Sequence, residues 1–426
     1  MRVFKFGGAS LKSANAIINM VSIVCNNKNE HPLIVVVSAM GKTTNALERI
    51  LQNALNGKEY MQELNKLKNY HLETASNLEN NDSSNITNTV NKLFQSFEIK
   101  LKELIDQYNG SIESYQFSYD QIVSYGELLS SNIVSEYMNL TGTKNSWLDA
   151  RNIIVTDSTY TEGKVNWKKT NQRIKEQIEE FKGIKITQGF IGADPYNNTT
   201  TLGREGSDFT GAIFANCLNA ESLTIWKDVP GILNADPKKF HDAQLYDYLS
   251  YREAAEMTFY GASVIHPKTI KPLANKKIPL NVRSFERPEK TGTLIGNEKS
   301  HKVFPAFITK NNQALVSFKV KDFSFIDENN LTTIFHTITN LNIKLNLMQN
   351  SATSFSICID YKEYQVNRLI EELSTQFKIL FNKKLQLITV KNYTEESIER
   401  FKNEKILLEQ RSRNNYRIVV SEDITF

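Results

Sequence analysis

The chain opens with a short apolar strand, a pair of glycines and an amphipathic helix, and this unit constrains its fold more than any other feature. Residues 3–6 predict a buried strand, Gly7 and Gly8 predict a tight turn, and residues 10–26 carry apolar side chains at helical spacing. Residues 33–38 form a second, continuous apolar strand. Strands buried on both faces are typical of parallel sheets covered by helices, so we predict a three-layer α/β domain.

The same alternation of strands and helices continues over the first 300 residues. Residues 184–191 and 222–226 predict further parallel strands. A polar run at 77–91 interrupts a helical pattern and predicts a loop between helices. Glycine does not occur after Gly296, which places a domain boundary near residue 300 and predicts domains at 1–300 and 303–426.

The C-terminal domain has short, closely spaced elements. Strands are predicted at 314–320, 343–348, 354–359 and 385–391, and helices at 330–341 and 364–377. Their order, βαββαβ, is the ferredoxin-like order of an α+β unit. This unit covers about 310–391, and a shorter tail at about 385–426 repeats part of it.

Composition limits the class of partner. The 51 Lys and Arg nearly balance the 47 Asp and Glu, and their even spread excludes a nucleic-acid footprint or a basic membrane-binding helix. Cys25, Cys217 and Cys358 are far apart in the sequence, which argues against a disulfide framework and a zinc site. The longest aliphatic run, at 33–37, is much shorter than the ~20 residues of a membrane helix. We therefore expect a cytoplasmic protein that binds small molecules.

Loops that follow the predicted strands carry the candidate chemistry. Lys5 ends the first strand, and Gly7, Gly8 and Ser10 offer donors to an anion such as phosphate. Two glycines alone are explained equally well by a turn. The sequence GKT at 41–43 resembles the end of a Walker A loop, but Val36 stands where that motif needs glycine, which argues against a P-loop enzyme.

Two later loops are also dense in polar groups. The loop at 189–208 gathers glycines, hydroxyls, Arg204 and Asp208 after a predicted strand. Residues 226–232 end another strand and are followed by the sequence ADPK at 235–238. This composition predicts a second loop for an anion or a nucleotide.

At these loops the chain strongly resembles the aspartate kinases of the amino-acid kinase family. The resemblance rests, in order, on KFGGAS, SAMGKTTN, SYGELLSS, QGFIG, TTTLGREGSD, IWKDVPGI, ADPK, EAAEMTFYGASVIHP, NVRSF and GTLI. It implies an αβα amino-acid kinase domain followed by a ferredoxin-like (ACT) regulatory region. It also implies ATP-dependent phosphorylation of the β-carboxylate of L-aspartate to 4-phospho-L-aspartate, the first step of lysine, threonine and methionine biosynthesis, in a homodimer or higher homo-oligomer.

The resemblance assigns roles for the amino-acid substrate. The side-chain carboxylate of aspartate has a pKa near ~3.9, so it is already an anion and needs no general base. Lys5 and Asp208 are the implied catalytic pair. Arg204 is expected to bind the α-carboxylate and Glu127 the α-ammonium. Taken singly, each residue has an alternative structural role: Arg204 in a surface ion pair and Glu127 as a helix-capping acid. The other implied pocket residues are Thr44, Phe190 and Ser207.

The family also implies an ATP site. Its residues here are Lys5, Gly7, Gly8, Ser10, Lys227, Asp228, Leu233, Lys238 and Ser263. Mg²⁺ is expected on phosphate oxygens with several waters, without a dedicated protein site. Two positions depart from the family: Lys227 stands where relatives have Thr or Ser, and Ser263 where they have Lys. We hypothesise that Lys227 replaces the missing cation.

The regulatory region departs from the family as well. The effector-contacting glycine is replaced by Asn329 or Asn330, and the acid that would pair with an amino-acid ammonium is replaced by Asn346. We expect weak or absent inhibition by lysine, because a neutral amide loses that ion pair. The short second unit is expected to serve dimer formation.

Two alternatives remain open. One is a glutamate or acetylglutamate kinase with the same fold, and the other is a catalytically silent amino-acid sensor, for which Ser263 is the hint. A homoserine dehydrogenase fused within these residues is not expected, because no GxGxxG loop is present.

Overall fold

The computed structural model describes residues 1–27, 32–79, 85–178, 182–262, 265–298, 304–322 and 324–421. They separate into two compact units. Unit 1 comprises Met1–Ile232, Leu245–Ala255 and Val264–Lys299, and unit 2 comprises Leu233–Gln244, Glu256–Ser263 and Ser300–Phe426. Two short segments from the first 300 residues therefore group with the C-terminal region.

Unit 1 is built on an eight-stranded sheet with the order β3-β4-β2-β1-β7-β9-β10-β8. Its strands are β1 (Arg2–Phe6), β2 (Leu33–Val37), β3 (Ser146–Leu148), β4 (Ile184–Gln188), β7 (Ser222–Lys227), β8 (Tyr248–Ser250), β9 (Leu280–Ser284) and β10 (Thr293–Gly296). β1 is central and pairs in parallel with β2 and β7. The parallel arrangement brings the carboxyl ends of these strands to one edge, where ligands bind in open α/β sheets.

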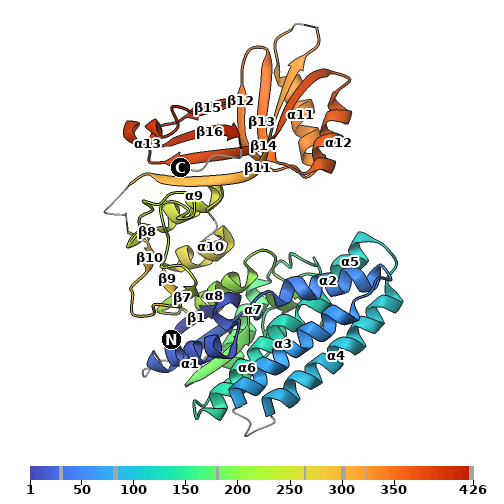
Figure 1. Cartoon of the computed structure of the whole chain (residues 1–426), viewed down its shortest axis with the longest axis vertical. Coiled ribbons are helices and arrows are strands. Elements are labelled where there is room, and N and C mark those ends of the chain that lie inside the picture. Colours follow the sequence, from blue (N-terminus) through green and yellow to red (C-terminus); the bar gives the residue numbers. More distant parts are fainter. Residues whose placement is uncertain are drawn as a thin grey trace. The chain divides into compact units, whose positions relative to one another are not determined.

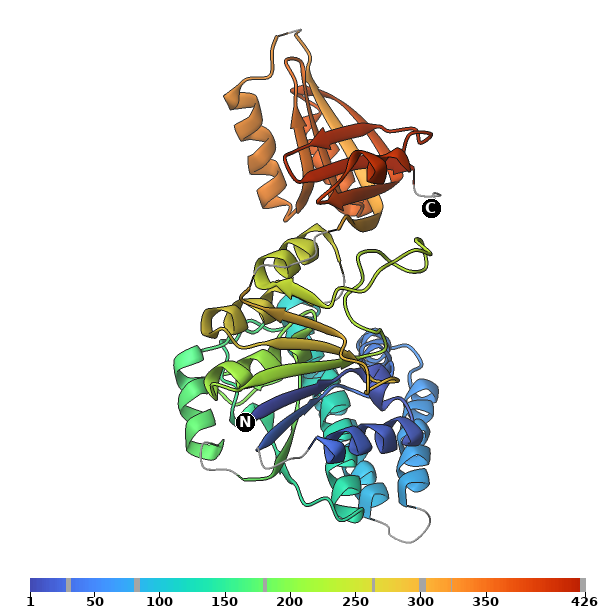
Figure 2. The same ribbon diagram turned by 90° about the vertical axis from the view of Figure 1, so that its left-hand side faces the viewer.

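Helices cover both faces of this sheet, as Figure 2 shows, which confirms the predicted three-layer architecture. The helices are η1 (Gly8–Leu11), α1 (Ala14–Asn26), α2 (Thr43–Leu55), α3 (Met61–Glu79), α4 (Asn85–Gln107), α5 (Ile112–Val123), α6 (Tyr125–Leu140), η2 (Ala150–Asn152), α7 (Trp167–Ile178), α8 (Gly206–Cys217), α9 (Tyr251–Tyr260) and α10 (Pro267–Lys276). α6 packs on β2 and β4, and α1, α3 and α4 contact it in turn, whereas α8 packs on β1, β2 and β7 with α7 and α10 beside it. Figure 1 shows α2, α3, α4 and α6 running side by side.

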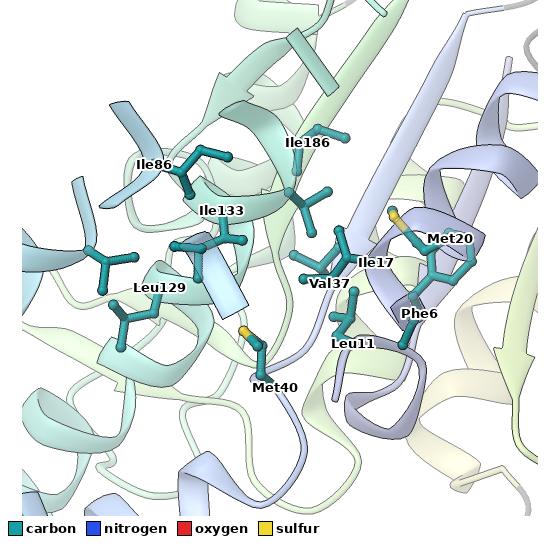
Figure 3. Close-up of a cluster of buried hydrophobic side chains, with 14 of the residues drawn as sticks. Phe6, Leu11, Ile17, Met20, Val37, Met40, Ile86, Leu129, Ile133 and Ile186 are labelled. Atoms are coloured by element: carbon teal, nitrogen blue, oxygen red, sulfur yellow. The ribbon is translucent and has the colours of Figure 1, made fainter. Parts of the chain in front are cut away.

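The main core of unit 1 lies between the sheet and α1 and α6. Figure 3 shows Phe6 and Val37 from the strands facing Ile17 and Met20 of α1, and all four side chains are fully buried. Each such burial stabilises the fold by about 1.5–3 kcal/mol. Because strand side chains alternate between faces, Lys5 of β1 points the other way, toward α8.

Three sequence predictions in unit 1 need correction. The first helix begins at Ala14 rather than residue 10, because residues 8–11 form a 3₁₀ turn and the hydroxyl of Ser13 caps α1 by accepting the Ala16 N–H at 3.3 Å. The single strand predicted at 184–191 is broken at Phe190, whose φ is 70°. A short hairpin of β5 (Ile191–Ala193) and β6 (Thr199–Thr201) follows the break.

The loop predicted at 77–91 is too long at both ends, since α3 continues to Glu79 and α4 begins at Asn85. Residues 80–84 lie outside the described residues. Many polar residues in this stretch conceal a helical spacing of the buried Ile86 and Val90. The Glu79 carboxylate accepts the Ile86 N–H at 2.7 Å, which stabilises the start of α4.

Unit 2 contains a six-stranded sheet with the order β12-β13-β11-β14-β16-β15. Its elements are β11 (Ala306–Val320), α11 (Glu328–Asn340), β12 (Leu345–Asn350), β13 (Ser354–Asp360), α12 (Glu363–Leu373), β14 (Phe377–Lys391), α13 (Glu395–Glu399), β15 (Leu408–Arg411) and β16 (Asn415–Ser421). The order from β11 to β14 is βαββαβ, which confirms the ferredoxin-like prediction.

Several predicted boundaries in unit 2 are wrong. The helix predicted at 364–377 ends at Leu373, and Phe377 already belongs to β14. β11 likewise begins at Ala306 instead of residue 314. Both strands are longer than predicted because their outer parts pair with each other, from Ala306 opposite Lys391 to Val320 opposite Phe377.

The segment 233–244 belongs to the core of unit 2. Phe240 stacks on Phe307 of β11 with ring centroids 5.0 Å apart. Asp242 forms an ion pair with Arg400, next to the end of α13. Among the described residues, no helix combines the length and the apolar character needed to cross a bilayer.

Candidate active site

A cavity of about 710 Å³ lies at the carboxyl edge of the central strands of unit 1. It collects side chains from β1, α2, α5, α6, the start of α8 and the end of β7. Nine of the residues proposed from the sequence line it: Lys5, Gly8, Thr44, Glu127, Phe190, Arg204, Ser207, Asp208 and Lys227. Segments separated by more than two hundred positions in the chain therefore meet around one space.

A buried carboxylate between two lysines forms the floor of the cavity. The Lys5 ammonium lies 2.6 Å from Oδ1 of Asp208, and the Lys227 ammonium lies 3.3 Å from Oδ2. Burial alone would raise the pKa of Asp208, but the charges of Lys5 and Lys227 outweigh it and hold this pKa below its usual value. Asp208 is therefore ionised, and it fixes two cations next to the cavity.

Glu127 at the start of α6 supplies a second buried acid. Its Oε1 accepts the Ala39 N–H at 3.3 Å, while its buried Oε2 has no hydrogen-bond partner among the described residues. Burial raises the pKa of Glu127 to about 8, although the Ala39 N–H and the charge of Lys5 oppose the shift. This carboxyl group is suited to a cationic ligand that would provide the missing donor.

Arg204 supplies the cavity with a positively charged guanidinium, opposite in sign to a carboxylate. It lines the cavity in the loop before α8, its side chain is exposed, and it forms no ion pair or hydrogen bond within the described ranges. A free guanidinium presents a fork of donors that matches a carboxylate. Arg204 and Glu127 together can bind the two charged groups of an α-amino acid.

Two glycines allow the backbone segments around the cavity to approach closely. A Cβ at Gly8 would lie 2.7 Å from the carbonyl oxygen of Ala39, so the loops after β1 and β2 touch only because this residue lacks a side chain. A Cβ at Gly206 would lie 2.6 Å from the ring of Phe190. The first turn of α8 is therefore held against the loop that follows β4.

The remaining proposed residues that the structure describes do not line the cavity. Gly7 lies next to it, since a Cβ there would be 3.7 Å from the Lys5 ammonium, whereas Ser10 is buried in η1 and Asp228 is exposed after β7. Leu233 and Lys238 belong to unit 2. Ser263 lies outside the described residues. The roles of these residues stay predictions.

Several lining residues were not proposed from the sequence. Glu48 lies one helical turn after Thr44 on α2, a spacing that could have revealed it. Tyr119 comes from α5, and Thr161 and Glu162 come from a loop without a motif. The N–H of Thr161 donates to the buried Asp120 at 2.9 Å, which fixes this loop against α5. Glu205 also lines the cavity, with a φ of 55°.

The lining has an excess of acidic groups. Five carboxyl groups (Glu48, Glu127, Glu162, Glu205 and Asp208) face three cationic side chains (Lys5, Arg204 and Lys227). In the described part of the chain, however, no group of three or more His, Cys, Asp or Glu side chains could hold a metal ion.

Comparison with known proteins supports what the geometry suggests. The profile of the Amino acid kinase family matches residues 1–284. The chain belongs to the amino acid kinase family. This member is 29% identical over 386 residues to bifunctional aspartokinase/homoserine dehydrogenase 2 of Arabidopsis thaliana, and the match covers 88% of this chain. It is also 29% identical over 394 residues to aspartokinase 1 of the same plant, covering 87% of this chain and 65% of the relative.

A solved structure of an amino acid kinase family member agrees over nearly the whole chain. E. coli aspartokinase III in complex with aspartate and ADP superposes with a TM-score of 0.82 at 25% sequence identity, covering 99% of this chain and 96% of that chain. The predicted fold class and the predicted resemblance to aspartate kinases are confirmed. The chain spans 42% of the length of the bifunctional Arabidopsis relative.

Proposed function

We propose that this protein is an aspartate kinase that transfers the γ-phosphoryl group of ATP to the β-carboxylate of L-aspartate, giving 4-phospho-L-aspartate and ADP. One observation carries the proposal: the Lys5, Asp208 and Lys227 cluster shares a cavity with Arg204 and Glu127. Within the described part of the chain, Arg204 has no ion pair and Oε2 of Glu127 has no hydrogen-bond partner. The similarity to aspartokinase III, whose structure contains aspartate and ADP, supports the same assignment.

In the proposed complex, Arg204 binds the α-carboxylate of aspartate and Glu127 binds its α-ammonium. Thr44, Phe190 and Ser207 line the same pocket and limit the orientation of the side chain. The β-carboxylate then faces the lysine cluster as an anion. Holding it there reduces the entropy that must be lost before reaction.

The reaction forms a bond from a carboxylate oxygen to the γ-phosphorus as the bond to the β-γ bridging oxygen of ATP breaks. The bridging oxygen leaves with ADP, and no proton has to be removed from the acceptor. Negative charge spreads over the equatorial oxygens of the transferred group, so the Lys5 ammonium stabilises the transition state. Asp208 acts as a positioning residue, because its carboxylate holds Lys5 at 2.6 Å.

ATP is proposed to lie along the first glycine loop. Gly7, Gly8 and Ser10 supply donors to the phosphates, and Lys227 adds a second cation beside Asp208. Mg²⁺ supplies charge neutralisation when it is bound with the nucleotide. Asp228, Leu233, Lys238 and Ser263 complete the proposed nucleotide site by family resemblance.

The C-terminal region is proposed to be an ACT-type regulatory region at 303–426, with a complete unit at about 310–391 and a shorter one at about 385–426. It would join subunits into a homodimer or a larger homo-oligomer, as edge-exposed sheets allow. The kinase domain is proposed to cover residues 1–300.

A hydroxylamine trap tests the proposed function. Purified protein with MgATP should form a hydroxamate from L-aspartate and little from L-glutamate or N-acetyl-L-glutamate. Product from glutamate or acetylglutamate instead would assign the chain to another kinase of this fold. Binding of aspartate without any hydroxamate would favour the silent-sensor alternative.

A further inference from the structure

A second cavity lies in unit 1 between helices α7, α8 and α10. Its volume is about 400 Å³, and it shares no lining residue with the candidate active site. Two aromatic rings, two lysines, two asparagines and a proline line it. Its size is within the range of about 300–1,000 Å³ that small-molecule sites occupy.

The apolar part of this cavity consists of exposed aromatic surface. Trp167 begins α7 with 39% of its surface exposed, and its ring contacts Phe209 of α8 at a centroid distance of 6.1 Å and an interplanar angle of 69°. Leaving an indole in water forgoes the free energy gained on burying it. A planar ring entering beside Trp167 and Phe209 would recover that free energy in the edge-to-face geometry that aromatic groups prefer.

The charged groups of the polar part are all cationic. Lys268, Lys271 and Asn275 lie on one face of α10 at helical spacing, and no acidic residue among those described lines the cavity. Neither lysine ammonium, nor the Asn275 amide, has an ion pair or a hydrogen bond in the parts of the chain that the structure describes. Two uncompensated ammonium groups raise the local concentration of anions.

The wall of the cavity is fixed before any ligand binds. The Asn216 side chain donates to the carbonyl oxygen of Pro272 at 2.7 Å, which ties α8 to α10. Pro272 lies inside α10 and has no N–H, so the carbonyl of Lys268 lacks its usual helical partner. A preformed wall lowers the entropy that binding must overcome.

We propose that this cavity binds a planar aromatic ring that carries a carboxylate or a phosphate. The ring packs on Trp167 and Phe209, and the anionic group lies between Lys268 and Lys271. Phe209 directly follows Asp208 on α8, and the two side chains line different cavities. A ligand here would therefore contact the helix that carries the catalytic carboxylate from its other side.

Calorimetric titration of the full chain tests the site. Saturating ADP and L-aspartate are kept present so that the candidate active site is filled. The probes are indole-3-acetate, with indole and acetate as its separate halves, and phenyl phosphate, with phenol and inorganic phosphate as its separate halves. We expect at least one whole probe to bind at least about tenfold more tightly than either half, and the better probe identifies carboxylate or phosphate as the preferred anion.

Variants locate the binding. Trp167→Leu and Lys271→Gln should each weaken the better probe by about tenfold or more. Lys169→Gln, an exposed change on the same helix as Trp167 and outside the cavity, should leave it unchanged. Thermal melts of all three variants should match the parent. Absence of binding by both whole probes, halves that bind as well as the whole, or equal affinity in all variants would overturn the proposal.

Discussion

The ammonium of Lys227 lies 3.3 Å from the Asp208 carboxylate, on the oxygen that Lys5 leaves free. Lys227 therefore stands as the second cation of the proposed phosphoryl-transfer centre. The family resemblance indicates position 227 as one of two departures from relatives, and the contact with Asp208 agrees with the hypothesis that Lys227 compensates for the lysine replaced by Ser263.

Lys227→Thr tests this compensation. The substitution removes a partly buried charge next to the proposed triphosphate, so we expect the KM for ATP to rise by about tenfold, equivalent to about 1.4 kcal/mol. The hydroxamate assay at varied ATP measures it, with Lys290→Thr, an exposed lysine outside the cavity, as the control. A KM for ATP equal to that of the parent would remove the hypothesis.

A double-mutant cycle on Lys5 and Asp208 tests whether they act as a unit. Asp208→Asn removes the carboxylate that pairs with the buried Lys5 ammonium. The substitution should therefore lower the unfolding free energy by about 3–5 kcal/mol, and it should also lower kcat. Lys5→Met should reduce kcat by at least about a thousandfold if this ammonium stabilises the transition state.

The double variant should be less destabilised than the sum of the two single variants, because it leaves neither the Asp208 carboxylate without Lys5 nor the Lys5 ammonium without Asp208. Urea unfolding of the four proteins gives the comparison. Strict additivity of their unfolding free energies would show that the two side chains are not coupled.

Glu127 predicts a pH dependence of aspartate binding. Its pKa of about 8 in the empty site means that it carries a proton at neutral pH. Binding an ammonium requires the ionised form, so the KM for aspartate should rise as the pH falls from 8 to 6, by up to about tenfold per unit. Glu127→Gln should raise this KM and remove its pH dependence, while the KM for ATP keeps its own profile. A KM for aspartate that is flat across this range in the parent would contradict the assignment.

The same group predicts an opposite effect on stability. Because the folded-state pKa of Glu127 lies above its ordinary value, its contribution to stability is present at acid pH and is lost as the pH rises through about 8. Glu127→Gln should therefore raise the unfolding free energy of the ligand-free protein more at pH 9 than at pH 5, by an amount on the order of a few kcal/mol. Calorimetric melts at both pH values measure the difference, and an identical effect at both would show that the group does not titrate in this way.

Asn346 leads to a prediction for regulation. Its side-chain oxygen accepts a hydrogen bond from the Lys310 ammonium at 2.8 Å. Its amide nitrogen donates to the side-chain oxygens of Gln313 and Asp360 at 2.8 and 2.9 Å. With these bonds made and no charge of its own, it offers little to an amino-acid ammonium. Millimolar lysine should therefore inhibit the reaction weakly or not at all, and strong inhibition at micromolar lysine in the same assay would refute this.

The sequence predicts those residues of the candidate active site that belong to contiguous sequence motifs. Lys5, Arg204 and Asp208 lie in or directly beside loops whose glycines and charges are visible in the sequence. Tyr119 and Thr161 reach the same cavity only through packing of α5 and through the Asp120 hydrogen bond, and neither interaction leaves a local pattern. Only the tertiary structure shows that such residues line the cavity.

The elements of the fold also separate into those that local sequence patterns predict and those that depend on tertiary pairing. The parallel strands of unit 1 and the βαββαβ order of unit 2 follow from apolar runs and were predicted. The start of β14 at Phe377 was not, because its first residues are mostly exposed and do not alternate between apolar and polar side chains. They form a strand because β11 pairs with them along its length.

The chain passes between the two units at 232/233, 244/245, 255/256, 263/264 and 299/300. A fragment cut at residue 300 would thus lose Phe240 and Asp242, leaving Phe307 and Arg400 without the partners that they contact. The residues after 300 therefore do not contain the whole core of unit 2. Exchange of this region between relatives would need the two inserted segments to travel with it.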